Sequence, residues 1–230
     1  MNELINYQCT DGIATLQLNN GKVNALSPAL IQQFNSCLDQ AEQDKAIIII
    51  TGQPGIFSGG YDLKVMLSGP ANAIDLVAQG SALTRRMLAH PQPIIIACSG
   101  HAIAKGAFLL LAADYRIATA GDFTIALNEV EIGMVMHQAG IVLAQGRLTP
   151  AAFQRAVNNA ERFTPEAAVS AGFVDQVVHA DELINTAQTV AQTMKKLNMR
   201  AHYQTKLKVR QQLLVDLEAA IEQDKVYASH

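Results

Sequence analysis

The sequence predicts an α/β fold built on a parallel β-sheet with helical crossovers. Two apolar runs rich in isoleucine, at 47–50 and 94–98, are typical of strands buried on both faces, because half-exposed strands alternate polar and apolar residues. Between these runs lies a helical pattern at 71–89. Strand, helix and strand in this rhythm favour parallel strands. The 230 residues suffice for one large domain with a substantial core.

Composition excludes several classes of protein. The net charge is −3 and only 16% of residues are charged, so nothing in the electrostatics favours a nucleic-acid ligand. No apolar run approaches the roughly 20 residues that cross a bilayer, and the N-terminus lacks a basic region followed by an apolar one. We therefore expect a cytosolic protein without a membrane partner. Cys9, Cys37 and Cys98 lack metal-type spacing and are expected to be buried thiols, with no metal site.

The N-terminal elements follow from turn and capping signals. A turn signal at 11–12 and strict alternation across 13–18 predict that the chain begins with two paired strands. Residues 19–25 form a polar loop. Ser27 followed by Pro28 marks a helix start. Its apolar stripe consists of Leu30, Ile31, Phe34, Leu38 and Ala41.

The later elements are shorter. After the strand at 94–98, the chain repeats a strand, a glycine turn and an apolar helix across 99–114. The remaining pattern predicts strands at 115–118, 123–127 and 173–178, helices at 137–146, 150–159 and 165–171, and helix from 181 to near the end. We expect a core at 1–180 and a C-terminal helical segment at 181–230.

The most informative stretch runs from 50 to 64, where a buried strand leads into a glycine turn and then a helix. Gly59 and Gly60 can adopt backbone angles closed to residues with a β-carbon. Asp62 or a neighbour can begin the helix, so the N–H groups around it point outward without helical partners. Such N–H groups suit an anion. A purely structural turn is the alternative interpretation.

Three motifs in this order carry a resemblance to a known family. The pattern T-G-x-x-x-x-F-(S/A)-(A/G)-G-x-D-L is matched in order by Thr51, Gly52, Phe57, Ser58, Gly60, Asp62 and Leu63. Further motifs lie at 97–114 and 123–133. From about residue 10 to 180 the chain resembles the crotonase (enoyl-CoA hydratase/isomerase) superfamily. The resemblance implies a spiral of ββα units, C-terminal helices that pack between subunits of trimers or hexamers, and an acyl-CoA thioester substrate without a separate cofactor.

The resemblance also implies an oxyanion hole made by two backbone N–H groups. Such donors stabilise charge on the thioester oxygen, and losing one typically costs about 10² to 10³ in rate. They fall on Tyr61 and on Lys105, which lies in the second turn between Ala104 and Gly106. Tyr61 is larger than the usual alanine or leucine, and Lys105 replaces a glycine, so the acyl pocket should differ in shape. Without the resemblance, Lys105 is typical of a solvated lysine beside a turn.

Glu129 is the candidate proton carrier. It lies among apolar residues near the end of an expected strand, where desolvation raises the pKa of a carboxyl group toward values useful for proton transfer. Alone, it is also typical of a surface residue at a strand end. The resemblance places the superfamily's catalytic glutamate here, with a local run similar to enoyl-CoA isomerases. Glu131 is expected to be solvated or ion-paired.

Phe108 distinguishes between reactions. Hydratases of this superfamily carry a second glutamate two residues after the glycine of the second turn, where this chain has Phe108. Moving a double bond from C3 to C2 needs one base, whereas adding water benefits from two acid/base groups. The sequence therefore favours an isomerase that converts 3-enoyl-CoA to 2-enoyl-CoA. The alternatives are a hydratase in which Glu131 or a histidine replaces the missing acid, and an acyl-CoA-binding member without catalysis.

Other candidates concern coenzyme A and the pocket wall. The K-x-N-A-L spacing at 22–26 matches a loop that contacts coenzyme A in the superfamily. His101 and His137 can line the acyl pocket, although a structural or surface role is favoured for each. A basic cluster in the last third of the chain resembles a C-terminal helix surface that can meet coenzyme A phosphates in the superfamily, but a solvated helix face is the favoured interpretation. The coenzyme A contacts expected are Lys22, Val23, Ala25, Ser58, Gly60, Tyr61, Asp62, Leu63 and Lys64, and the basic cluster is Lys206, Lys208 and Arg210.

Overall fold

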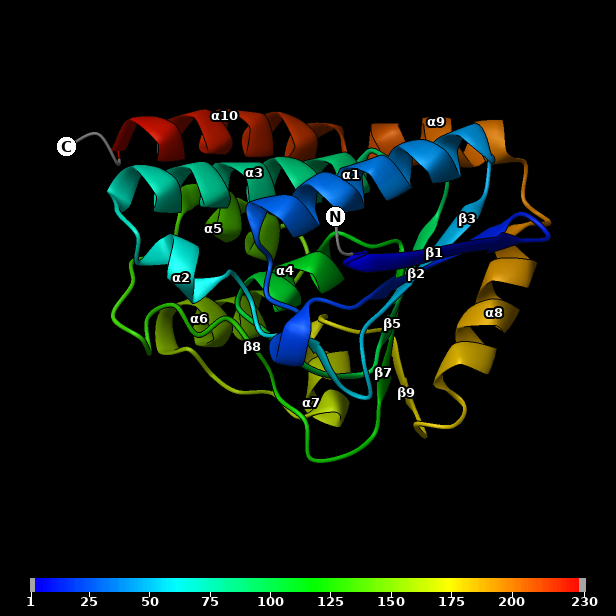
Figure 1. Cartoon of the computed structure of the whole chain (residues 1–230), viewed down its shortest axis with the longest axis horizontal. Coiled ribbons are helices and arrows are strands. Elements are labelled where there is room, and N and C mark those ends of the chain that lie inside the picture. The colour runs from blue at the N-terminus through cyan, green and yellow to red at the C-terminus, as the bar shows by residue number, and fades with distance from the viewer. Residues whose placement is uncertain (1–2, 228–230) are drawn as a thin grey trace.

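A computed structural model describes residues 3–227 and contains a six-stranded sheet (Figure 1). Its first two strands pair antiparallel, and every later neighbour is parallel, which confirms the predicted sheet. In spatial order the strands are β1 (Ile5–Thr10), β2 (Ile13–Leu18), β3 (Ile47–Thr51), β5 (Ile94–Cys98), β7 (Tyr115–Thr119) and β9 (Gln176–Val178).

A second sheet consists of three short parallel strands, which alternate in the sequence with strands of the large sheet. Its members are β4 (Gly55–Ser58), β6 (Gly100–Ile103) and β8 (Ile125–Ala126). Each follows a strand of the large sheet, so the chain passes from the large sheet to the small one three times. This is the ββα spiral expected from the resemblance. The local pattern treated 55–58 as part of a turn and did not predict β4.

Helices cover the large sheet on both faces. In Figure 1, α1, α3 and α10 form a layer along one side, and α8 lies on the opposite side. The helix starts follow the predicted caps, since the Ser27 hydroxyl accepts a hydrogen bond from the N–H of Leu30. The helices are α1 (Pro28–Gln43), α2 (Leu63–Met66), α3 (Pro70–Leu88), α4 (Lys105–Leu111), α5 (Gln138–Gln145), α6 (Pro150–Asn159), α7 (Pro165–Ala171), α8 (Leu183–Met194), α9 (Met199–Val209) and α10 (Gln211–Tyr227), with a 3-10 turn at Gly21–Val23.

Alternate residues of β3 enter two separate cores. Ile48 and Ile50 belong to the main core, whereas Ile47 and Ile49 pack with α8 on the other face. This confirms that the strand is buried on both sides. The helices after residue 181 contribute to these cores, because α8 packs on the sheet and α10 packs on α3 and α5. A boundary at 180 and a role for 181–230 between subunits stay predictions.

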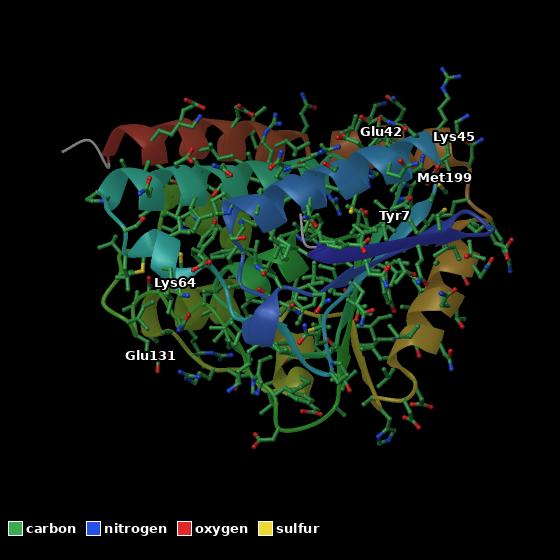
Figure 2. All side chains as sticks on the ribbon, in the orientation of Figure 1. Tyr7, Glu42, Lys45, Lys64, Glu131 and Met199 are labelled. Atoms are coloured by element: carbon green, nitrogen blue, oxygen red, sulfur yellow. The ribbon has the colours of Figure 1, made fainter. Side chains whose placement is uncertain are left out.

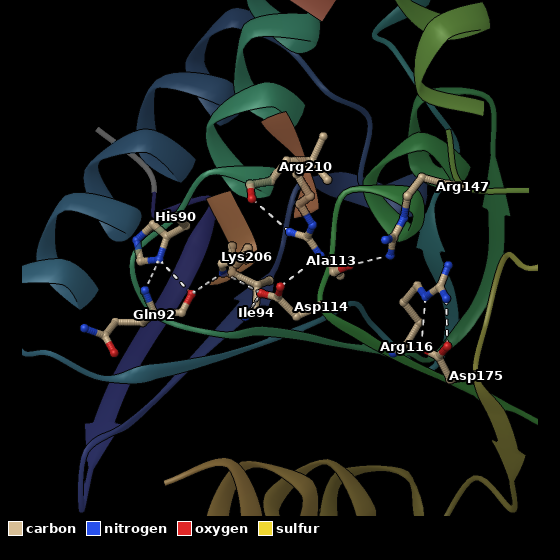
Figure 3. A network of polar contacts seen from close by, with 11 residues as sticks. His90, Gln92, Ile94, Ala113, Asp114, Arg116, Arg147, Asp175, Lys206 and Arg210 are labelled. Atoms are coloured by element: carbon tan, nitrogen blue, oxygen red, sulfur yellow. Dashed lines mark hydrogen bonds and ion pairs between the residues drawn. The ribbon is translucent and has the colours of Figure 1, made fainter. Parts of the chain in front are cut away.

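A buried ion cluster ties α9 to the sheet (Figure 3). The Asp114 carboxylate lies 2.9 Å from the Lys206 ammonium and 2.9 Å from the Arg210 guanidinium. It also accepts the N–H of Ile94 at the start of β5, at 2.8 Å. The prediction of a solvated face is therefore wrong for Lys206 and Arg210, while Lys208 is exposed as expected.

The cysteines differ from one another. Cys98 is buried as predicted and Cys37 is half-buried, but Cys9 is exposed, so that prediction is wrong there. Cys9 lies on β1, an edge strand that turns most of its length toward solvent. Within residues 3–227 no group of side chains is arranged to hold a metal ion, and no helix is long and apolar enough to cross a membrane.

Candidate active site

The two glycine turns meet at one end of the small sheet. Because β4 and β6 are parallel neighbours, the bends that follow them emerge side by side. A β-carbon added to Gly60 would lie 3.1 Å from the β-carbon of Ala104 and 3.5 Å from the backbone nitrogen of Lys105. One added to Gly106 would lie 2.3 Å from the carbonyl oxygen of Ser58. Glycine is therefore required for this close approach.

Each bend presents a backbone N–H without an internal acceptor. Ala104 has φ 49° and ψ −118°, a conformation that is strained for a residue with a β-carbon, and α4 begins at Lys105 directly after it. Tyr61 precedes Asp62, whose carboxylate caps α2 by accepting the N–H of Lys64 at 2.9 Å. Among the hydrogen bonds within residues 3–227, none uses the N–H of Tyr61 or Lys105 as donor. Two unused donors on adjacent bends can hold one carbonyl oxygen.

The loop at 22–26 lies against the first bend. The Ser58 hydroxyl donates to the carbonyl of Asn24 at 2.9 Å, and the N–H of Gly59 donates to the carbonyl of Val23 at 2.8 Å. Asn24 is buried in the left-handed conformation and donates its side-chain N–H to Phe57. Sequence reasoning did not assign Asn24 a role, although asparagine's tolerance of that conformation is a usable signal.

The residues expected to contact coenzyme A differ in their exposure to solvent. Lys22, Val23, Leu63 and Lys64 are exposed near the bend, and Ala25 and Asp62 are half-buried. Ser58 and Gly60 are buried and hold the bend in shape.

A cavity of about 210 Å³ opens beside the two bends. Larger hollows of about 460, 450, 440 and 230 Å³ are also present, but none of them is lined by Tyr61, Ala104 or Glu129, so we assign the site to the smaller cavity. Among its lining residues are Tyr61, Leu63, Ala104, Glu129, Val135 and His137.

Glu129 supplies the carboxylate that lines this cavity. Its residue is 7% exposed, and its Oε2 has no hydrogen-bond partner among the described residues. Burial raises the pKa of Glu129 to about 7, an effect partly offset by its own backbone N–H and by the charge of Lys105. A carboxylate with a free oxygen and a pKa near neutrality suits a general base. Glu131 is exposed and paired with Arg162 at 2.8 Å, as expected, and Figure 2 shows it at the outer edge of the molecule.

The side chain of Lys105 is buried, so the interpretation as a solvated lysine is wrong. The residue is 1% exposed, and its Nζ donates to the hydroxyl of Thr84 on α3 at 3.3 Å. The Nζ also lies 5.8 Å from the ring centroids of both Tyr61 and Phe108. Burial lowers the pKa of Lys105 to about 7, and the nearby Glu129 carboxylate partly offsets this shift.

Phe108 lies at the position where the resemblance places the second carboxylate of hydratases. The ring is buried and packs edge-on against the imidazole of His137, with centroids 5.5 Å apart. His137 lines the cavity, and burial together with the charge of Lys105 lowers its pKa, which keeps it neutral. His101 is structural, as favoured: its Nδ1 accepts the N–H of Thr124 at 3.0 Å and its ring packs on Phe123.

Tyr61 closes the cavity on the side of α3. Its hydroxyl donates to the carbonyl of Val77 at 3.3 Å. A β-carbon at Gly80 would lie 2.2 Å from that hydroxyl oxygen, so glycine on α3 makes room for the ring. Sequence reasoning recognised the size of Tyr61 but had no means to pair it with Gly80.

Comparison with known proteins identifies the family and the fold. The sequence model of the enoyl-CoA hydratase/isomerase family matches residues 8–230, and the chain belongs to that family. Its fold is that of crotonase-like proteins: it superposes on a structure of an enoyl-CoA hydratase/isomerase family protein from Pseudomonas syringae with a TM-score of 0.97 and 64% identity, covering 98% of both chains.

Two curated relatives carry the names of different reactions. The chain is 31% identical to mouse "enoyl-CoA delta isomerase 1, mitochondrial" over 81% of its own length and 66% of the mouse protein. It is 37% identical to a "probable enoyl-CoA hydratase" of Bacillus subtilis over 56% of its length and 51% of that protein. The chain thus spans about two thirds or less of these relatives.

Proposed function

We propose that this chain is an acyl-CoA isomerase that converts a 3-enoyl-CoA into a 2-enoyl-CoA. The N–H groups of Tyr61 and Lys105 hold the thioester oxygen as negative charge builds on it. The Glu129 carboxylate removes a proton from C2, which gives a dienolate. The same group, now protonated, returns that proton to C4, and the double bond moves to C2–C3. Glu129 ends the cycle ionised, so no further reactant is consumed.

The observation that carries this proposal is the pairing of one buried carboxylate with a phenyl ring. Glu129 lines the cavity, and the buried Phe108, which packs on the cavity residue His137, lies where the resemblance places the second acid of hydratases. A positioned acid or base typically contributes about 10² to 10⁴ in rate, so hydration without the second group should be slower by that order. Isomerisation loses nothing, because one base performs both proton transfers. The isomerase named among the relatives is consistent with this choice.

Binding of the coenzyme A portion is proposed at the loop and first helix beside the cavity. Lys22 and Lys64 are exposed cations there, and Val23 and Leu63 are exposed apolar side chains. The proposal needs no cofactor besides the coenzyme A of the substrate itself. A cytosolic location and assembly into trimers or hexamers belong to the same proposal and rest on the family resemblance.

The test is turnover of two thioesters by purified protein. We expect faster conversion of 3-hexenoyl-CoA than hydration of crotonyl-CoA, and loss of the former in Glu129→Gln. Glu131→Gln is the matched control, because it makes the same change two residues away on an exposed side chain. Full isomerase activity in Glu129→Gln would refute the assignment.

A hydratase is the second candidate, because His137 lines the same cavity and one relative is named a probable hydratase. In that case crotonyl-CoA would be hydrated faster than 3-hexenoyl-CoA is isomerised, and His137→Gln would abolish hydration. Tight binding of acyl-CoA with neither reaction would indicate a member without catalysis.

A further inference from the structure

A hollow of about 450 Å³ adjoins the cavity that Glu129 lines, and we call it the outer hollow. Met134 and Val135 line both the cavity and the outer hollow. Among the described residues that line the outer hollow, none carries a charge, and Asn158 at the end of α6 supplies the polar side chain. The apolar side chains that line only the outer hollow are Val130, Met136, Ile141 and Val157. A surface of this composition suits a hydrocarbon.

The segment at 130–135 borders both hollows and turns apolar side chains to solvent. Its exposed apolar residues are Val130, Ile132, Met134 and Val135, and Val135 is 94% exposed. The backbone holds the segment in place, because the N–H of Met134 donates to the carbonyl of Glu129 at 2.8 Å. Glu131 lies at the outer edge of the molecule (Figure 2) and pairs with Arg162. Apolar side chains gathered on an exposed segment typically mark a binding surface.

The positions of the reacting carbons direct the acyl chain toward this segment. In the proposed function the thioester oxygen lies at the N–H groups of the two bends, and Glu129 reaches both C2 and C4. The carbons after C4 must therefore leave the reacting centre on a side that is open. Tyr61 closes the cavity on the side of α3, where its hydroxyl donates to the carbonyl of Val77 at 3.3 Å. Met134 and Val135 line the cavity as well and remain exposed, so the chain can leave across them.

The other hollows do not offer a path for a hydrocarbon chain. The hollow of about 460 Å³ is lined by charged side chains, among them Arg85 and Glu218, and the one of about 440 Å³ by Asp114 and Lys206. The hollow of about 230 Å³ shares no lining residue with the cavity among the residues that the structure describes. The outer hollow is therefore the place where a chain that leaves the cavity can stay out of water.

We propose that the outer hollow binds the end of the substrate's acyl chain, so that the protein prefers 3-enoyl-CoA esters with chains longer than that of 3-hexenoyl-CoA. This inference rests on the proposed function, which places the thioester and the base in the cavity. Met134 and Val135 are then specificity-determining residues, and the flexible methionine adapts to the chain that crosses it. Each methylene group that leaves water for an apolar surface favours binding by up to about fourfold.

The first test compares 3-hexenoyl-, 3-octenoyl- and 3-decenoyl-CoA as substrates. We expect kcat/KM to rise with each added pair of methylene groups, by up to about fifteenfold where both are buried. Equal kcat/KM for the three esters would overturn the proposal.

Two variants test whether the outer hollow causes this preference. Val130→Asn should lower the ratio of kcat/KM for 3-decenoyl-CoA to that for 3-hexenoyl-CoA, because Val130 lines the outer hollow and not the cavity. Asn158→Leu should raise the same ratio, because it replaces the polar side chain of the outer hollow by an apolar one. Val215→Asn is the matched control, since it makes the same change at an exposed valine of α10. A ratio that neither variant changes would overturn the proposal.

Binding of saturated esters tests the inference without turnover. Hexanoyl-, octanoyl- and decanoyl-CoA have no double bond to move, and calorimetry gives their affinities. We expect the Kd to fall along this series by up to about fifteenfold per pair of methylene groups, and the heat-capacity change of binding to become more negative. Rising affinity in a protein that does not isomerise 3-enoyl-CoA would refute the isomerase assignment and support the outer hollow. Isomerisation with equal affinity for the three saturated esters would support the assignment and overturn this inference.

Discussion

The contact between Gly80 and Tyr61 predicts opposite effects of Gly80→Ala on the unfolding free energy. The substitution should destabilise the protein when Tyr61 is present and stabilise it when Tyr61 is replaced by leucine. In Gly80→Ala the new β-carbon would lie 2.2, 2.6 and 2.8 Å from Oη, Cε1 and Cζ of Tyr61. Overpacking of this kind typically costs about 1 to 3 kcal/mol. Alanine is also a better helix former than glycine by about 0.8 to 1 kcal/mol. The net effect is a loss of about 0 to 2 kcal/mol of unfolding free energy.

In Tyr61→Leu the ring is absent and only the helix-propensity effect remains. Gly80→Ala in that background should therefore stabilise the protein by about 0.8 to 1 kcal/mol. The assay is thermal or chemical unfolding of all four proteins of the double-mutant cycle at one protein concentration. Equal effects of Gly80→Ala in both backgrounds would refute the proposed packing.

The same substitution should affect catalysis. We expect displacement of the Tyr61 ring to displace its backbone N–H as well, because the residue lies between the bend and the short helix α2. Loss of one oxyanion donor typically costs about 10² to 10³ in rate. We expect Gly80→Ala to lower kcat for isomerisation and the added Tyr61→Leu to restore part of it. Unchanged kcat in Gly80→Ala would show that the ring and the N–H move independently.

Three further outcomes follow from the site and the core. Because burial raises the pKa of Glu129 to about 7 and the ionised form is the base, kcat/KM should rise about tenfold per pH unit below 7 and level off above it; a flat profile would contradict this role. Phe108→Glu should raise crotonyl-CoA hydration by up to about 10² to 10⁴, and a folded variant without any gain would contradict the account of that position. Asp114→Ala should cost about 3 to 5 kcal/mol in chemical denaturation, because it leaves Lys206 and Arg210 as buried cations without their carboxylate; a loss below about 1 kcal/mol would show that the cluster is solvated.

Local signals were sufficient for the large sheet and the main helices. The isoleucines of 47–50 cannot be half-exposed, and Ser27 with Pro28 fixes a helix start whatever lies around it. In the small sheet, strands were predicted at 123–127, which contains β8, and within 99–114, which contains β6, but β4 gave no such signal. The run 55–58 contains a glycine and a serine and becomes a strand because β6 lies beside it.

The same holds for the site: features marked by the local sequence were predicted, and features that depend on tertiary contacts were not. The sequence indicated two bends and one glutamate, since glycines and a motif mark them locally. It did not reveal that Lys105 is buried, because the hydroxyl that accepts from its Nζ belongs to Thr84 on α3, 21 residues earlier. Nor did it pair Lys206 with Asp114, which precedes it by 92 residues. Burial of a long cation depends on tertiary partners, and spacing along the chain does not identify them.

The most direct test of the central claim follows one hydrogen through a single turnover. Glu129 is 7% exposed, so a proton taken from C2 should be returned before it exchanges with water. With 3-hexenoyl-CoA deuterated at C2 and ordinary water, mass spectrometry or NMR of the product should find deuterium at C4. The transfer should persist in Glu131→Gln and vanish with the activity in Glu129→Gln. Product whose C4 carries hydrogen from the solvent alone would contradict a single buried carboxylate acting as the proton carrier.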